Sequence, residues 1–245
     1  MLILRAAQWR VIGTLWVISF DELKVVFMSK TDFETARIAM VDCQIRPADV
    51  THYNIIEAML KVPREVFFPE KLREIAYTGE HIQVKNDRYA LDPRITAKIL
   101  NLININESDL VLNVAGCYGY MANILSYFAQ AVVMIEESEL AKEAERILGE
   151  QSIDNVIVKA CPLVEGAGDY GPYDAVVIEG GITFVPDAII NQLKLGGRIV
   201  AIFMNGSVGE CQLGFRSSDG INWRFGFNAA VPLLNDFRNE TEFVL

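Results

Sequence analysis

The sequence predicts a doubly wound α/β fold, in which a mostly parallel sheet ends in an antiparallel hairpin and is preceded by a helical layer. Short, unbroken apolar runs alternate with helical segments through the middle of the chain, which is typical of strands buried on both faces of a parallel sheet. The tail changes to a strict alternation of apolar and polar residues. With 245 residues, 51% apolar and 22% charged, the chain suits one domain with a sizeable core.

The first 27 residues are interpreted separately. Arg5 and Arg10 precede an apolar run over 11–20, which loosely imitates a signal peptide. Acidic residues follow at once, no small-residue cleavage site is present, and the run is too short to span a bilayer. Met28, in MSKTDFETA, is a natural start. We therefore interpret 1–27 as an upstream-start extension and 28–245 as a single domain.

The helical layer is expected over 28–90, and the Rossmann-like core over 91–245. Thr31 or Asp32 can cap a first helix that runs through Arg46 and ends at Pro47. A second helix is expected from Thr51 to the residue before Pro63, and a third after Pro69. These helices would form an accessory layer before the main sheet.

The core pattern consists of five apolar strand candidates and the helices between them. The strands are expected at Leu110–Ala115, Ala131–Ile135, Val156–Val158, Ala175–Ile178 and Ile199–Phe203. The helices are expected at Tyr120–Phe128, Leu140–Leu148 and Val185–Leu193. This order of strand, helix and strand predicts right-handed crossovers and a parallel sheet.

The tail predicts an antiparallel hairpin at the edge of that sheet. Cys211, Leu213 and Phe215 alternate with polar neighbours, and a second alternating run begins at Trp223. The segment 217–220 between them, Ser-Ser-Asp-Gly, is a turn sequence.

The net charge and the pattern of cysteines indicate which partners, metal sites and cellular compartment to expect. The net charge is -10, which disfavours a nucleic-acid substrate, and no segment is long enough to predict a membrane span. The four cysteines are scattered without a CxxC pair, and neither histidine has a cysteine at ligand spacing. No metal site is expected, and the cysteines indicate a reducing compartment, by default the cytoplasm.

Several motifs together resemble the protein-L-isoaspartate O-methyltransferase family. In order, they are MVDCQIR at 40–46, AMLKVPREVFFP at 58–69, AY at 76–77, GY at 119–120, PYDA at 172–175 and QLKLGGR at 192–198. The resemblance runs from about residue 33 to the end of the chain. It implies a class I S-adenosylmethionine-dependent methyltransferase fold. The implied activity is methyl transfer to the isoaspartyl carboxylate of a damaged protein, which would be the partner of this chain.

The resemblance also implies a cofactor site at the first strand–loop–helix, VLNVAGCYGY over 111–120. Asn113 stands at the family's acidic position, Ala115 and Cys117 replace two glycines, and Gly119 is kept. We expect the two replacements to place β-carbons in a loop that touches the ligand. Glu136, at the end of the second strand, is expected to accept both ribose hydroxyls. The full set of expected cofactor contacts is Asn113, Ala115, Gly116, Gly119, Tyr120, Glu136 and Leu163.

The substrate side is implied in the same way. Leu91 takes the place of the family's catalytic serine in YALDP, so no catalytic residue is assigned. Asp92 and Glu179 are expected beside the substrate. An ionised carboxylate needs no general base to attack a methyl group, so positioning of the reactants would be the main task.

Two alternatives remain at this point. The chain could keep the fold as a non-catalytic binding or regulatory module, because position 91 and the loop at 113–119 depart from the family pattern. Glu136 could be a solvated strand-end charge, since Glu137 adjoins it. Cys117 is interpreted as a buried, unreactive thiol rather than a nucleophile. A nicotinamide-dependent oxidoreductase would need a G-x-G-x-x-G loop that the sequence lacks.

Overall fold

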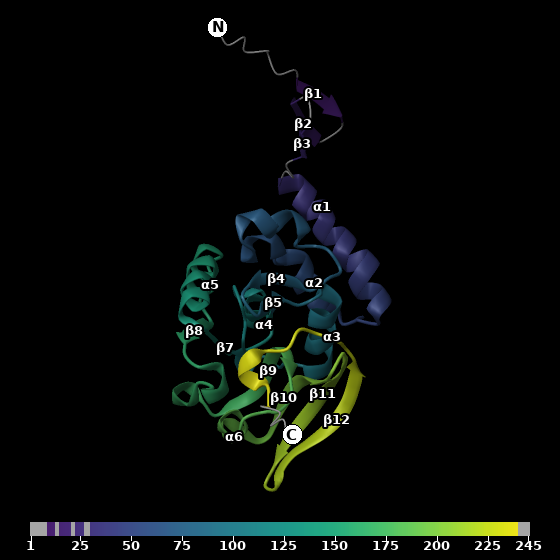
Figure 1. Cartoon of the computed structure of the whole chain (residues 1–245). Coiled ribbons are helices and arrows are strands. Elements are labelled where there is room, and N and C mark those ends of the chain that lie inside the picture. Colours follow the sequence, from purple (N-terminus) through teal and green to yellow (C-terminus); the bar gives the residue numbers. More distant parts are fainter. Residues whose placement is uncertain (1–8, 13–14, 21–22, 27–29, 240–245) are drawn as a thin grey trace, which may run out of the picture.

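The computed structural model describes residues 9–12, 15–20, 23–26 and 30–239 (Figure 1). In the first part, β1 (Trp9–Ile12), β2 (Leu15–Phe20) and β3 (Leu23–Val26) pair antiparallel in a small sheet of their own, in the order β1-β2-β3. Met28 lies outside the described residues. That the domain begins there stays a prediction.

The next segment is helical, as expected, but the first helix is not one continuous α-helix. The α-helix α1 spans Lys30–Met40, a π-helical turn follows at Val41–Ile45, and a 3-10 turn follows at Arg46–Ala48. The prediction of a single helix through Arg46 is therefore wrong. Arg46, the residue before Pro47, keeps the α conformation, and the chain leaves the helical region at Asp49, whose φ is 62°. The π turn leaves both Val41 and Ile45 fully buried.

The rest of the layer follows the prediction more closely. The second expected helix is α2, Tyr53–Lys61. The third is a 3-10 helix, Glu70–Ile75, and another 3-10 turn lies at Arg64–Phe67.

A hairpin within 28–90 corrects the expectation of a purely helical layer. It consists of β4 (Ile82–Lys85) and β5 (Arg88–Ala90), which pair antiparallel in a two-stranded sheet separate from the main one. Its turn passes through Asn86, whose φ is 42°. Ile82 and Val84 are buried in the core, which anchors β4 beneath the turn.

The main sheet has seven strands in the order β12-β11-β10-β9-β6-β7-β8. The five expected strands are all present, as β6 (Leu110–Val114), β7 (Ala131–Glu136), β8 (Val156–Ala160), β9 (Tyr173–Ile182) and β10 (Leu193–Asn205). They pair parallel, with β6 between β7 and β9. The carboxyl ends of β6, β7 and β9 therefore meet at one edge, where ligands bind in such sheets.

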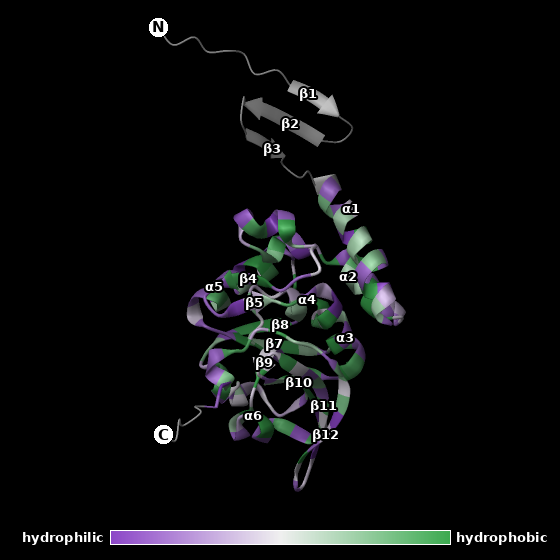
Figure 2. Ribbon diagram, turned by 45° about the vertical axis from the view of Figure 1, so that its right-hand side comes forward, coloured by the Kyte–Doolittle hydropathy of each residue, from purple (hydrophilic) through white to green (hydrophobic). Residues whose placement is uncertain are grey.

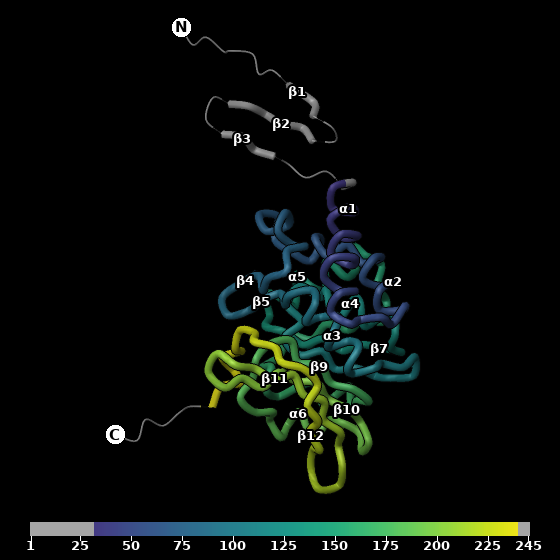
Figure 3. The backbone as a smooth tube through the Cα atoms, turned by 90° about the vertical axis from the view of Figure 1, so that its right-hand side faces the viewer, coloured from purple at the N-terminus to yellow at the C-terminus, as the bar shows by residue number. Residues whose placement is uncertain are grey.

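The tail hairpin is confirmed as β11 (Val208–Ser217) and β12 (Gly220–Asn228). β11 pairs antiparallel with β10, and β12 forms the edge of the sheet. Two views that differ by 90° about the vertical axis both place this hairpin at the end opposite the helical layer (Figures 1 and 3).

Helices cover both faces of the sheet, as the doubly wound prediction requires. Successive residues of the parallel strands enter two different apolar clusters: Val132 and Met134 belong to one, Val133 and Ile135 to the other. The first cluster includes α3 (Pro93–Ile103), α4 (Tyr120–Ser126) and α5 (Ser138–Glu150), together with the helical layer. The second includes the short helix α6 (Asp187–Asn191). The helices carry both hydrophobic and hydrophilic residues along their length, in green and purple (Figure 2).

Candidate cofactor and active site

The carboxyl ends of β6 and β9 bring two expected site residues together. The Asn113 side chain, fully buried near the end of β6, donates from Nδ2 to Oε1 of Glu179 at 2.8 Å. Asn113 Oδ1 is buried and has no hydrogen-bond partner among the residues that the structure describes. Asn113 therefore binds the neighbouring Glu179 carboxyl group through Nδ2 and leaves its Oδ1 available to accept a hydrogen bond from a ligand.

The loop after β6 uses the left-handed conformation three times. The φ angles are 60° at Ala115, 51° at Cys117 and 96° at Gly119, which are the three positions that carry glycine in the family pattern. The backbone geometry for which glycine is preferred is thus retained with two side chains present, at a cost of roughly 1–2 kcal/mol per non-glycine residue.

The two replacement side chains differ in where they point. Ala115 is fully buried and belongs to the second apolar cluster, and the expectation that its β-carbon touches the ligand stays a prediction. Cys117 does line the cavity described below, and its thiol donates to the Tyr89 carbonyl at 3.5 Å. Burial raises the pKa of the Cys117 thiol, in agreement with its interpretation as an unreactive group.

Gly116 is a glycine because its neighbours leave no room for a β-carbon, and its φ angle does not require glycine. A β-carbon built there would lie 2.6 Å from Asn113 Oδ1 and 2.8 Å from Met134 Cγ. Both neighbours are buried side chains, so any larger residue at 116 has to displace packed atoms. The backbone at 116 therefore passes closely over the end of β6.

Glu136, the last residue of β7, is fully buried and accepts three hydrogen bonds. Its Oε1 accepts from Arg88 Nε at 3.0 Å and from the Glu137 backbone N–H at 2.9 Å, and its Oε2 accepts from the Cys117 backbone N–H at 2.9 Å. The interpretation of Glu136 as a solvated charge is therefore wrong. Burial raises the pKa of Glu136, and the Arg88 guanidinium acts in the opposite direction.

Arg88 is buried to 1% exposure although it sits in a hairpin at the edge of the fold. Its guanidinium also approaches Asp87 at 2.9 Å, and Glu137 and Asp236 at 3.2 Å each. One cation is thus shared by four carboxylates. Sequence analysis missed this residue, because a single arginine in the turn NDRY gives no local signal.

A small cavity lies between the helical layer and the loop after β6. Its lining residues come from both, and its volume is about 20 Å³, which is room for about one water molecule. The lining residues are Arg64, Phe67, Phe68, Val84, Ala90, Leu91, Thr96, Gly116, Cys117, Tyr118, Tyr120 and Glu179. In the described part of the chain, the buried Tyr120 hydroxyl has no hydrogen-bond partner.

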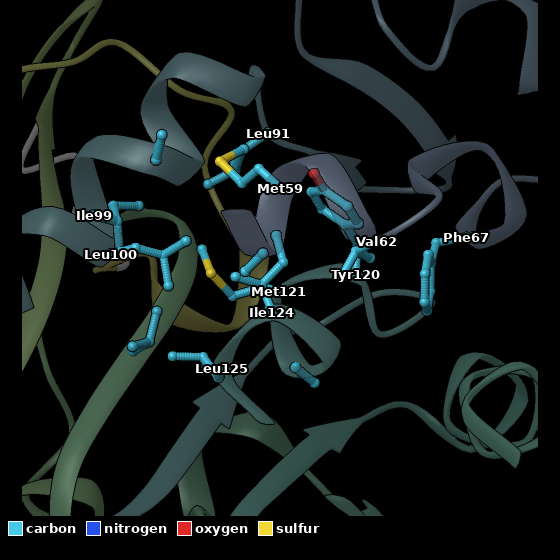
Figure 4. Packing of buried hydrophobic residues seen from close by; sticks show 14 of the residues in the cluster. Met59, Val62, Phe67, Leu91, Ile99, Leu100, Tyr120, Met121, Ile124 and Leu125 are labelled. Carbon is cyan, nitrogen blue, oxygen red and sulfur yellow. The ribbon is translucent and has the colours of Figure 1, made fainter. Parts of the chain in front are cut away.

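Leu91 forms an apolar wall of this cavity. It is 2% exposed and belongs to the cluster that includes Met59, Val62 and Tyr120 (Figure 4). Its carbonyl accepts from Arg64 Nη2 at 2.7 Å. Arg64, also missed from the sequence, is 1% exposed and lies over the Tyr120 ring at 4.6 Å. Arg64 is the arginine of the VPREVFFP motif, so this motif could have identified it as a site residue from the sequence.

Glu179 is the one expected substrate-side residue at the cavity. Burial and the nearby Glu136 charge raise its pKa to about 8, and the Asn113 hydrogen bond opposes this. The carboxyl group is therefore mainly protonated at pH 7, and it adds little negative charge to the cavity.

Two other expected residues lie elsewhere. Asp92 caps α3, where its carboxylate accepts from the Arg94 backbone N–H at 2.7 Å, and it lines a separate open groove with His81 and Lys98. Leu163 is 1% exposed within the second apolar cluster and does not line the cavity. The family resemblance predicted Asp92 at the site, and the position of Leu163 after the third strand predicted Leu163 there.

The residue types fit S-adenosylmethionine, but the guanidinium of Arg88 and the size of the cavity stand in its way. Within the described residues, Asn113 Oδ1 and the Tyr120 hydroxyl are buried polar atoms without hydrogen-bond partners, and Glu136 places a carboxylate where the sequence predicts the ribose contact. The Arg88 guanidinium already occupies that carboxylate. The small cavity likewise has to widen for a cofactor to enter.

The parallel sheet, its edge hairpin and the carboxylate at the end of its second strand define a class I S-adenosylmethionine-dependent methyltransferase fold. The family model for protein-L-isoaspartate(D-aspartate) O-methyltransferase matches residues 36–215. The chain belongs to this family, which confirms the resemblance read from the sequence.

Relatives and solved structures agree with this assignment. The protein-L-isoaspartate O-methyltransferase of Geobacter metallireducens is 34% identical over 170 residues, covering 69% of this chain and 79% of the relative. That of Methanospirillum hungatei is 31% identical, covering 82% and 94%. One solved protein-L-isoaspartate O-methyltransferase has a TM-score of 0.71 at 21% identity, covering 81% of this chain and 65% of that one.

A Plasmodium falciparum structure, described as a putative member and complexed with S-adenosyl-L-homocysteine, has a TM-score of 0.70 at 14% identity. It covers 82% of this chain and 98% of that one. At these identities the two structures support the fold.

The described residues contain neither a candidate membrane span nor a candidate metal site. Within the described ranges, none of the helices has the length and apolar character needed to cross a membrane. The same part of the chain holds no group of three or more His, Cys, Asp or Glu side chains arranged to bind a metal ion.

Proposed function

We propose that this chain is an S-adenosylmethionine-dependent protein-L-isoaspartate O-methyltransferase that methylates isoaspartyl carboxylates in damaged proteins. The observation that carries the proposal is the family match over 36–215, because it covers both the helical layer and the cofactor half of the sheet. When bound, S-adenosylmethionine supplies an electrophilic methyl group. The substrate would be a protein or peptide that carries isoaspartate, and the reducing cytoplasm would suit the four free cysteines.

The site residues have positioning roles in this proposal. Glu136 and the loop at 115–119 would hold the cofactor, with Asn113 and Tyr120 supplying further polar contacts. Glu179, mainly protonated at neutral pH, would allow a carboxylate to approach and could donate a hydrogen bond to it. Leu91 provides no hydroxyl, and Glu179 is the carboxyl group among the residues that line the cavity.

The test is methyl transfer to a matched pair of peptides. Radiolabelled S-adenosylmethionine is incubated with an isoaspartyl peptide and with the same peptide containing ordinary aspartate. We expect base-labile methyl ester on the isoaspartyl peptide alone. If folded protein binds S-adenosylhomocysteine but labels neither peptide, the substrate assignment fails. If it binds no S-adenosylhomocysteine at all, the alternative of a non-catalytic module is supported.

A further inference from the structure

We infer that Arg88 is an internal competitor of the cofactor, and that the tip of the β4–β5 hairpin is a latch that closes the ribose position. This inference rests on the proposed function and concerns the regulation of the same site. The Glu136 carboxylate already accepts hydrogen bonds from three N–H donors, and the hydroxyls of a ribose would need acceptor positions on the same carboxylate.

Arg88 and a ribose would compete for the same acceptor positions on Glu136. A carboxylate offers about four lone-pair positions, and Glu136 already accepts from the side chain of Arg88 and from the backbone N–H groups of Glu137 and Cys117. A ribose with two free hydroxyls donates two hydrogen bonds. One present donor therefore has to leave. The two N–H groups are fixed by the chain on either side of the carboxylate, so the arginine side chain is the donor that can move.

The hairpin tip is held by contacts that can open. Besides Glu136, the guanidinium pairs with Glu137 and Asp236, whose side chains are 51% and 46% exposed. The Asn235 backbone N–H donates to Asp87 at 3.3 Å, and Lys85 pairs with the exposed Glu139. Arg88 itself is 1% exposed, but the carboxylates of Glu137 and Asp236 reach solvent, so salt screens these outer pairs more than the buried pair of Arg88 with Glu136. The tip is therefore held by one buried pair and several outer pairs that are open to solvent, while Ile82 and Val84 anchor its base.

The latch would lower the apparent affinity for the cofactor. When the competent state is only partly populated, the apparent dissociation constant increases by the inverse of that population. Weakening the latch without touching Glu136 should therefore tighten binding. The chain offers such changes, because Glu137 and Asp236 contact Arg88 Nη2 only at the outer side of the cluster.

The experiment is calorimetric titration of S-adenosylhomocysteine into the full chain and three variants. The double variant E137Q/D236N should bind roughly 2- to 10-fold more tightly than the unaltered protein, and Arg88→Ala more tightly still. The matched control is Asp169→Asn, which removes a comparable ion pair with Lys159 away from the hairpin and should leave the affinity unchanged. Circular dichroism checks that each protein is folded, and if Arg88→Ala is unfolded the double variant decides.

The outcomes separate the latch from the proposed function. Tighter binding by the latch variants, with an unchanged control, supports the latch. Equal or weaker binding by folded latch variants overturns it and leaves the proposed function standing. Absence of binding in every folded protein, including one without Arg88, overturns both.

Discussion

At the scale of single residues, Gly116 is the position with the least freedom in the site. Gly116→Ala would push a methyl group against Asn113 and Met134, and we expect the free energy of unfolding to fall by about 1–3 kcal/mol. Urea denaturation measures this. The matched control is Gly149→Ala in α5, where a β-carbon meets nothing within 4 Å and should stabilise the helix by roughly 0.5–1 kcal/mol. Equal effects of the two changes would contradict the steric argument.

Glu179 makes stability depend on pH. Its pKa rises from an ordinary value of 4.5 to about 8 in the folded protein, so the folded state binds more protons than the unfolded state between these values. The stabilisation is complete below about pH 4.5 and is lost as pH rises through 8, with a slope of up to about 1.4 kcal/mol per pH unit.

The comparison with Glu179→Gln isolates this contribution. Glutamine keeps an oxygen that can accept from Asn113, and it does not titrate. From pH 5 to pH 8 the unaltered protein should therefore lose unfolding free energy relative to the Glu179→Gln variant. Urea denaturation at both pH values measures it, with Glu210→Gln, an exposed residue of β11, as the control. A difference that does not change with pH would show that Glu179 titrates normally.

At the scale of elements, the loop after β6 separates two substitutions that look equivalent in sequence. Cys117→Gly would widen the cavity and should tighten binding of S-adenosylhomocysteine. Ala115→Gly removes a methyl group that points into the core, so it should leave the affinity unchanged. Calorimetric titration of both variants checks the contrast. Tighter binding by Ala115→Gly would mean that its side chain obstructs the ligand.

Leu91 connects the helical layer to the core, so restoring the family's serine is not a simple gain. Leu91→Ser would remove a side chain that is 2% exposed and place a hydroxyl in an apolar cluster. We expect a loss of about 2–5 kcal/mol of unfolding free energy. The matched control is Leu195→Ser, since Leu195 is 73% exposed and should change stability by at most about 0.5 kcal/mol. Similar losses in chemical denaturation would refute the packing role.

The elements also show which features can be predicted from sequence. The strands from β6 to β10 and the tail hairpin were predictable because hydrophobic periodicity is a local signal. The hairpin β4–β5 was missed because its alternation lasts only four residues. The contact between Arg88 and Glu136 joins positions 48 residues apart, and no local pattern records such a pair. Ala115 shows a third limit, since the sequence identifies the loop position but does not say towards which side its methyl group points.

At the scale of the whole molecule, one apolar cluster joins the helical layer to the sheet. It contains Met40 and Met59 from the layer, and Val111 and Val200 from the strands. A shared core of this kind makes the layer and the sheet one cooperative unit, as is usual for single domains. Protein that starts at Met28 should therefore unfold in a single transition.

The shortened protein provides two independent probes of that transition. The chain has three tryptophans, and only Trp223 remains when residues 1–27 are removed. Trp223 lies in the edge strand β12, against Phe203 with ring centroids 4.8 Å apart, so its fluorescence reports on the hairpin end. Far-UV circular dichroism reports on the helices, including the layer at the opposite end. We expect the two urea curves to coincide, because unfolding of either end would expose the shared core; separate midpoints would show that the layer and the sheet are independent units.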